Sequence, residues 1–154
     1  MDGSSWLGMD THFLNDLFGN ESKLNRWPGV IRQVDRDQGL ARIACSHDAG
    51  VLYALVVDDG VEWIRPERRV HLLFKETEVV LSPCGTAPWP GSFPAKVVSV
   101  RHGRILSEVV LECAGAPLCA LLDSAVEKAL GIRDGLEVDA WIPPAALALE
   151  DGEP

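Results

Sequence analysis

The sequence predicts an all-β protein made of two small barrels in tandem. Short segments rich in Val, Ile and Leu recur along the chain, and Gly, Asp, Asn or Pro residues bound each of them. These strand-like segments appear twice in the same order. With 154 residues, 47% of them hydrophobic, the chain is large enough to bury a core. Segments this short are best closed into barrels, because closure removes exposed strand edges.

The repeat is offset by 66 residues, which brings Val34 onto Val100 and Pro28 onto Pro94. Four blocks match in all, and the alignment opens by two residues between the second and the third of them. In chain order the matched pairs are 30–45 with 96–111, 52–56 with 118–122, 64–70 with 132–138, and 72–81 with 140–149. The chain therefore contains two tandem copies of one β-rich module.

Turns and one helix complete the predicted module. Residues 35–39 and 46–50, with their counterparts 101–104 and 114–117, have the composition of hairpin turns. Residues 123–130 begin with Asp123 and end at Gly131, which predicts a short helix. The counterpart, 58–63, is shorter and contains Gly60, so its helix is predicted more weakly.

These patterns divide the chain into five parts. The first module is expected over 25–83 and the second over 92–149, joined by a Pro- and Gly-rich linker at 84–91. An extension, 1–24, precedes them, and an acidic tail, 150–154, is expected to fray.

The extension contains a predicted amphipathic helix that Asp10 would cap and Gly19 would end. Its apolar stripe consists of Phe13, Leu14, Leu17 and Phe18. One interpretation is that the stripe packs on its own barrel or on a neighbouring subunit. The other is a docking peptide that lies in the groove of a partner protein.

Charge and composition exclude several classes of function. Lys plus Arg number 14 and Asp plus Glu 23, so the formal charge is −9, which argues against nucleic-acid binding through phosphate contacts. No apolar run approaches a membrane span, and the first residues do not resemble an export signal, so a cytoplasmic location is expected. The four cysteines form no C-x-x-C pair, and Cys45, Cys113 and Cys119 have the setting of buried reduced thiols rather than metal ligands.

No pattern typical of an enzyme is present. His12, His47, His71 and His102 are scattered, and no triad or carboxylate pair with supporting motifs appears. The cluster of Arg65, Arg68 and Arg69 offers positive charge, and its simplest interpretation is a surface patch that pairs with Glu62 and Glu67.

The repeated unit resembles the molbindin module, known as the Mop or TOBE domain, over about 125 of the 154 residues. The similar features are Asn25 before the first strand, the Val-x-x-Val/Ile opening, the Ala54-Leu55 and Ala120-Leu121 steps, Leu130 before the last strand, and the string 73–79, LFKETEV. The last string is the most distinctive. The resemblance implies five-stranded barrels of the oligonucleotide-binding type, assembled into homotrimers that bind molybdate or tungstate at their interfaces.

Molybdate is a tetrahedral dianion that convergent backbone N–H groups, hydroxyls and few cations can hold, even in an acidic protein. Carried over from the resemblance, the oxyanion-binding residues in the first copy are Ser22, Lys23, Asn25, Lys75 and Thr77. Leu24 stands where the family has Arg, and Glu76 replaces a small residue after Lys75. Val56 and Asp59 stand where the family has hydroxyls.

The second copy departs further from the family pattern. Pro143 occupies the position of Lys75, and only Ser92 and Ser124 remain as second-tier candidates for oxyanion binding. Both serines also suit ordinary roles in a turn and a helix cap. The second copy is therefore expected to have lost at least one site.

Two hypotheses of different class follow. The first is a non-enzymatic cytoplasmic protein that binds molybdate or tungstate for storage or homeostasis as a homo-oligomer. The second is an oligomeric scaffold whose oxyanion sites have degraded and whose N-terminal segment recruits a protein partner. A helix-turn-helix regulator and an ATPase attachment are not expected, since residues 1–24 are too short for the former and no phosphate-binding Gly-rich loop is present.

Overall fold

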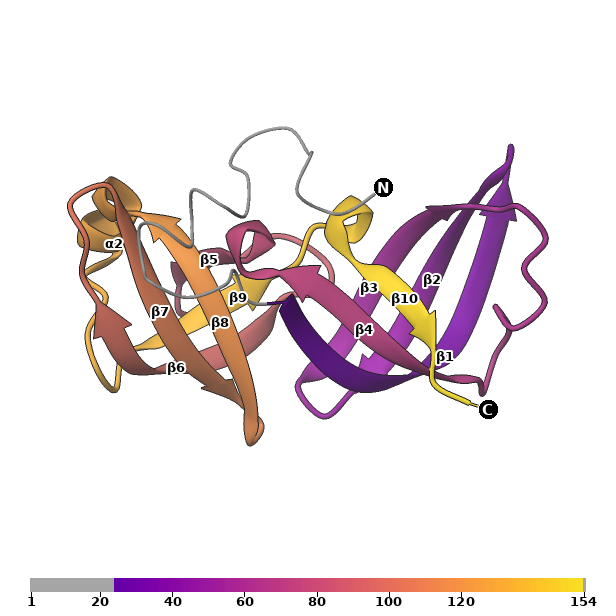
Figure 1. Ribbon diagram of the computed structural model, residues 1–154, viewed down its shortest axis with the longest axis horizontal. Helices are drawn as coiled ribbons and strands as arrows, with labels where there is room; N and C mark the ends of the chain where they lie inside the picture. The colour runs from indigo at the N-terminus through magenta and orange to yellow at the C-terminus, as the bar shows by residue number, and fades with distance from the viewer. Residues whose placement is uncertain (1–23, 154) are drawn as a thin grey trace.

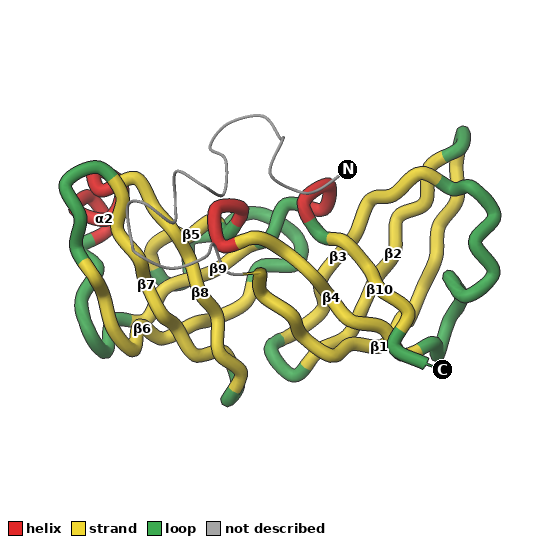
Figure 2. The backbone as a smooth tube through the Cα atoms, viewed as in Figure 1, coloured by secondary structure: helices red, strands yellow, loops and turns green. Residues whose placement is uncertain are grey.

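The computed structural model describes residues 24–153 as two antiparallel sheets with three short helical segments (Figures 1 and 2). Each copy contributes five strands. Those of the first are β1 (Leu24–Asp37), β2 (Leu40–His47), β3 (Gly50–Val57), β4 (Arg69–Lys75) and, after the 3-10 turn η1 (Glu76–Glu78), β5 (Val80–Pro83). Those of the second are β6 (Phe93–Arg101), β7 (Leu106–Cys113), β8 (Ala116–Asp123), then helix α2 (Ser124–Leu130), β9 (Glu137–Trp141), the 3-10 turn η2 (Pro144–Ala146) and β10 (Ala148–Asp151).

The two copies exchange their last strands. One sheet has the order β10-β4-β1-β2-β3 and the other β5-β9-β6-β7-β8. Thus β5, from the first copy, pairs with β9, and β10, from the second, pairs with β4. Figure 1 shows this exchange by colour, because the yellow strand β10 lies in the indigo and magenta lobe. The predicted all-β fold of two five-stranded units is confirmed, but each unit takes one strand from the other copy.

The duplication is visible in the strand registers. Val34 lies opposite Ile43 in the first copy, and Val100 lies opposite Val109 in the second. Both copies shift register at the same place, between Ile31 and Gln33 and between Val97 and Ser99. A bulge adds one residue to one strand of a pair and bends it. Its recurrence at the 66-residue offset confirms that the two copies share one backbone plan.

Local sequence explains the hairpins. Gln38 and Gly39 have φ values of 51° and 80°, and Ala114 and Gly115 have 50° and 84°. Two successive residues with positive φ form a type I′ turn, whose twist matches that of the flanking strands. The predicted turns at 35–39 and 114–117 are therefore confirmed.

The predicted helix at 123–130 is confirmed, and its counterpart is absent from the first copy. The Asp123 side chain accepts a hydrogen bond from the Ala125 N–H, and Gly131 ends α2 in the left-handed conformation. Residues 58–63 form turns without a helix, with Gly60 at a φ of 81°. The expectation of a short helix in each module was therefore wrong for the first, which has only the 3-10 turn η1 among the described residues.

A single core joins the two sheets around Trp27 and Phe93. These residues occupy equivalent positions in the two copies, and their ring centroids lie 5.5 Å apart. Trp27 also packs edge-on against Phe74 at 5.3 Å and stacks on His47 at 4.3 Å. Trp27 and Phe93 are each 2% exposed, so both rings are removed from water. The two copies consequently share their apolar centre.

Side chains of β1 also form hydrogen bonds with backbone groups of β8, which is the edge strand of the second sheet. Asn25 donates from Nδ2 to the Cys119 carbonyl and accepts from the Cys119 N–H, both at 2.9 Å. The indole N–H of Trp27 donates to the Pro117 carbonyl at 2.8 Å. An edge strand presents unpaired N–H and C=O groups that otherwise need water or another chain. Asn25 and Trp27 satisfy three of these groups within the molecule.

The acidic tail is ordered up to Glu153, contrary to the expectation that it would fray. Asp151 ends β10 and forms a bidentate pair with Arg68, at 2.7 and 2.9 Å. This contact raises the pKa of Arg68 and lowers the pKa of Asp151 through the hydrogen bond between them. Glu153 lies 3.3 Å from the same guanidinium. The expected pairing of the arginine cluster with Glu67 was also wrong, since Glu67 pairs with Arg32.

Replacement of Asn25 by Leu should destabilise the whole fold. The Leu side chain is similar in size but leaves the Cys119 N–H and C=O without their partner. Each buried backbone group left unsatisfied costs about 1–3 kcal/mol, so we expect the free energy of unfolding to fall by about 2–4 kcal/mol in urea denaturation. Gln33→Leu is the control, because Gln33 is exposed and bonds only to Asp35. Equal stability of Asn25→Leu and the unsubstituted protein would contradict this role.

Candidate functional site

Three of the predicted oxyanion residues lie together where β1 begins and β4 ends. Leu24 is directly opposite Lys75 and Asn25 is opposite Phe74, so Lys75 and Asn25 lie at the same end of the sheet, with their side chains on opposite faces. Thr77 follows in η1, which contacts β8 of the second copy. Figure 2 shows this red turn beside β8, at the junction of the two lobes. The strand register thus places Asn25, Lys75 and Thr77 at one end of the sheet.

Asn25 has a structural role that the sequence did not predict. It is 7% exposed, and its amide oxygen and one amide N–H are engaged by Cys119. An amide group has two N–H donors, so one remains for a ligand. The residue holds β1 against β8 and fixes the geometry of the neighbouring Lys75 strand.

Lys75 is the cation of this region. Its side chain is half-buried, and burial lowers the pKa of its ammonium group, an effect that nearby Glu78 partly opposes. Removal of water disfavours the charged form of a lysine unless an anion is close. A bound dianion would favour the charged form of this ammonium group. This electrostatic setting suits reversible binding of an anion.

Glu76 places a carboxyl group next to Lys75 in the chain. Its side chain is 2% exposed, so a carboxyl group is buried directly after the candidate cation. A carboxylate near a dianion is repulsive, most of all where water is excluded. Leu24, at the position where the family has Arg, is 53% exposed and supplies no charge. The site therefore has fewer positive groups than the family pattern.

The remaining first-copy candidates lie outside the described residues. These are Ser22 and Lys23, together with the proposed docking stripe of Phe13, Leu14, Leu17 and Phe18.

Ser92 and Ser124 are engaged in local hydrogen bonds. The Ser92 hydroxyl donates to the Trp89 carbonyl at 2.7 Å within the linker. Ser124 is 2% exposed, and its hydroxyl donates to the Gly103 carbonyl at 2.7 Å and lies 2.9 Å from the Ser107 hydroxyl. The helix cap is Asp123 instead. Ser92 thus has the turn role that the sequence also allowed, whereas Ser124 belongs to a buried hydrogen-bonded cluster and is not the helix cap.

A buried polar cluster around Glu127 was missed by sequence reasoning. Glu127 is 4% exposed and accepts hydrogen bonds from the Ser107 hydroxyl at 3.0 Å and from His102 at 2.8 Å. The hydrogen bond from His102 is the main cause of the lowered pKa of Glu127. Because the serine bonds to the carboxylate and not to the histidine, the cluster lacks the order of a nucleophile with its base. It anchors α2 to the β6–β7 hairpin.

The two buried thiols, Cys45 and Cys113, do not provide a reactive site. Cys45 and Cys113 are buried, and burial raises the pKa of each thiol to about 12. A thiol with so high a pKa is protonated at neutral pH and is a poor nucleophile. Among residues 24–153, no three His, Cys, Asp or Glu side chains are grouped closely enough to bind a metal ion. No helix in this part of the chain has the length and apolar character needed to cross a membrane.

Comparisons with known proteins agree with the fold. Residues 90–149 match the family model of the TOBE domain. No curated protein matches the chain in sequence. The crystal structure of the cytoplasmic molybdate-binding protein ModG, with molybdate bound, superimposes with a TM-score of 0.75. The sequence identity is 17%, and the match covers 82% of this chain and 95% of that one.

The two halves of the chain are matched by different comparisons. The second copy is recognised by its sequence, whereas the first is recognised through the shared backbone plan and the superposition on ModG. ModG is a binding protein, so the resemblance in structure is to a binding protein and not to an enzyme. Residues 90–149 therefore match the TOBE domain family, and the fold of the whole tandem is similar to that of ModG.

Proposed function

We propose that this protein binds molybdate or tungstate reversibly at the Lys75 end of the first copy. The site would serve intracellular storage or homeostasis of the oxyanion, without catalysis. The observation that carries the proposal is the position of Lys75, a half-buried ammonium group with a lowered pKa at the same end of the sheet as Asn25, on a ModG-like fold. Ser22, Lys23 and Thr77 complete the proposed ligand set.

The chemistry of the proposed site is that of binding alone. One ammonium group, one free amide N–H and hydroxyls can satisfy the oxygens of a tetrahedral dianion. Because the ligand would be held by few groups, each donor should contribute strongly to the affinity.

Assembly into a homo-oligomer, a trimer by analogy with the family, is part of the proposal. Leu24 supports it, since this large apolar side chain is 53% exposed immediately opposite Lys75. Exposed apolar groups beside a site are typical of surfaces that another chain covers. A neighbouring subunit would also supply donors that a single chain lacks.

A second candidate function is an oligomeric scaffold that has lost oxyanion binding. Buried Glu76, the loss of Arg at Leu24 and Pro143 at the second lysine position favour it. In this case residues 1–24 would recruit a protein partner through Phe13, Leu14, Leu17 and Phe18. Deletion of residues 1–20 tests the idea, which fails if the oligomer mass and the proteins captured with it are both unchanged.

Titration calorimetry with molybdate, tungstate and sulfate should separate the two candidates. We expect micromolar binding of a metal oxyanion, and Lys75→Ala should weaken it by about tenfold or more, as for loss of one hydrogen bond to a charged group. Lys96→Ala is the control, because Lys96 is an exposed strand lysine of the second copy. Failure of both metal oxyanions to bind at micromolar concentration would exclude the storage function.

The affinity should also depend on alkaline pH through Lys75. The lysine must be protonated to attract a dianion, so affinity should fall as the pH rises through its lowered pKa, earlier than an ordinary lysine would require. Lys75→Arg keeps its charge at all these pH values and should remove the dependence. The measurement is calorimetry over a series of pH values from neutral to alkaline. An identical pH profile for Lys75→Arg would show that another group is responsible.

A further inference from the structure

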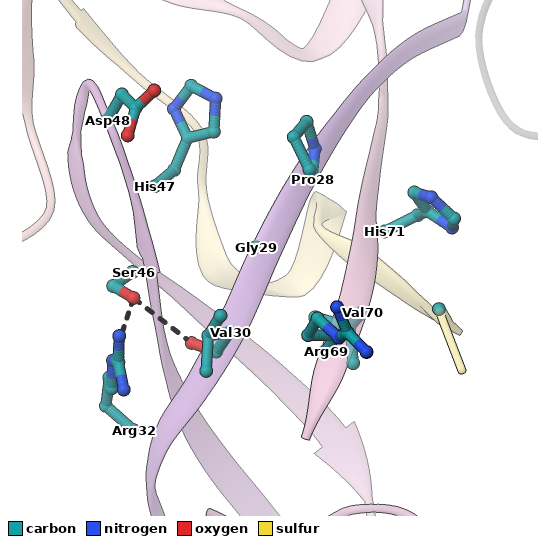
Figure 3. Close-up of a pocket in the computed structure, with 11 residues that line it drawn as sticks. Pro28, Gly29, Val30, Arg32, Ser46, His47, Asp48, Arg69, Val70 and His71 are labelled. Carbon is teal, nitrogen blue, oxygen red and sulfur yellow. Dashed lines mark hydrogen bonds between the residues drawn. The ribbon is translucent and has the colours of Figure 1, made fainter. Parts of the chain in front are cut away.

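A second concave region lies on the outer face of the first copy, away from Lys75. It is a cleft of about 630 Å³, with a floor formed by Pro28, Gly29 and Val30 of β1. Figure 3 shows Arg32 and Ser46 on one side of this floor and Arg69 on the other. The volume lies within the range of about 300–1,000 Å³ usual for small-molecule pockets. The cleft is therefore larger than a single inorganic oxyanion needs.

Hydrogen-bond donors converge on this cleft. Among the residues that the structure describes, none forms an ion pair or side-chain hydrogen bond with the Arg69 guanidinium. Arg32 is held in place, because its Nε donates to the Ser46 hydroxyl at 2.9 Å and its Nη1 to Glu67 at 2.8 Å. This leaves further N–H groups of both arginines available to a ligand. In a protein of net charge −9, such a pair of guanidinium groups is a local exception.

His47 and Asp48 form the far end of the cleft. Nδ1 of His47 accepts the Ala49 N–H at 3.0 Å, so the proton of the neutral ring is on Nε2. Burial lowers the pKa of His47, an effect that Asp48 opposes, and the ring stacks on Trp27. This end therefore offers one neutral donor and one carboxylate, whereas the opposite end is cationic. A ligand with an anionic group and a polar donor would match both ends.

The second copy provides an internal comparison for this surface. In the first copy, Val30 lies between Ser46 and Arg69 in the strand register. At the equivalent place in the second copy, Lys96 lies between Glu112 and Glu137. The backbone plan is the same, but the flanking groups are acidic. The cationic character is thus a property of the first copy and does not follow from the fold.

The segment that borders this face also differs between the two copies. In the second copy, the Ala87 N–H donates to Asp139 at 3.0 Å, so the linker lies against the equivalent face. In the first copy, Gly152 borders the cleft and leaves it open.

Two carboxylates lie near the cleft. Asp48 is part of its lining, and Glu153 accepts the Arg69 backbone N–H. The carboxylate of Glu153 is therefore engaged by the backbone and not by the Arg69 side chain.

We propose that this cleft binds a small organic molecule carrying a phosphate or carboxylate group. Arg69 and Arg32 hold the anionic group, Pro28 and Val30 contact the apolar body, and a hydroxyl or amine of the ligand faces Asp48. This site is separate from the proposed oxyanion site. Along β1, Val30, opposite Arg69, lies six positions after Leu24, opposite Lys75, which is about 20 Å on an extended strand.

Titrations followed by amide NMR test this site with three probes, phenyl phosphate, benzoate and inorganic phosphate. The full chain should bind at least one organic probe saturably, with shifts centred on Gly29, Val30 and Ser46. Arg69→Glu, which introduces the residue type found at Glu137, should weaken that binding by about tenfold or more. The fold should be retained, because the Arg69 side chain is exposed. Tighter binding of phenyl phosphate or of benzoate identifies the preferred anionic group.

Arg104→Glu is the matched control, since Arg104 is an exposed arginine in a turn of the second copy and its substitution changes the net charge equally. It should bind the organic probes as the unsubstituted protein does. Lys75→Ala should also leave this binding unchanged, which separates the cleft from the proposed molybdate site. The proposal is overturned if no organic probe saturates, if Arg69→Glu binds normally, or if inorganic phosphate binds as tightly as phenyl phosphate.

Discussion

The exchange of β5 and β10 is the constraint on which the rest of this structure depends. Each of these strands has only four residues, and each completes the sheet of the other copy. Strands this short cannot form a stable pair alone, so each sheet requires the other copy to be folded. Contacts of Trp27 with Phe93 and of Asn25 with Cys119 strengthen the same junction. The two copies therefore form one interdependent fold.

This interdependence places the candidate oxyanion site at the junction of the copies. Lys75 ends β4, and the chain then turns through η1 against β8 before β5 enters the second sheet. The crossing of the chain thus fixes the backbone that carries Lys75. Equivalent backbone in the second copy carries Pro143, which has no charge to offer. The duplicated fold is consistent with chemistry that is kept in one copy and lost in the other.

Much of the fold could be predicted from the sequence, because strand and turn signals are local. Gly39 and Gly115 marked hairpins, Asp123 and Gly131 marked the limits of α2, and the 66-residue offset predicted equivalent registers. The strand exchange could not be predicted, since an apolar strand has the same pattern whichever sheet it completes. The conformation of the tail depends on the ion pair between Arg68 and Asp151, which are 83 residues apart, and no local sequence pattern reveals such a contact.

The candidate site was predictable only in part. A resemblance in sequence singled out Asn25 and Lys75, and the register places both at one end of the sheet. The bonds of Asn25 to Cys119, however, depend on a contact 94 residues away. The cleft beside Arg69 was missed for a similar reason. Its donors come from three strands, and the arginine cluster appeared in the sequence as an ordinary surface patch. Buried Glu127 was equally hidden, because its partners His102 and Ser107 belong to a separate hairpin.

The central proposal is that, of the two copies of the module, the first binds the oxyanion. The most direct test is an anomalous difference map from crystals of the full chain grown with tungstate. The account predicts a tungsten peak within hydrogen-bond distance of the Lys75 ammonium group and none at the equivalent position beside Pro143. A peak beside Pro143 and Ser124, with none at Lys75, would contradict it.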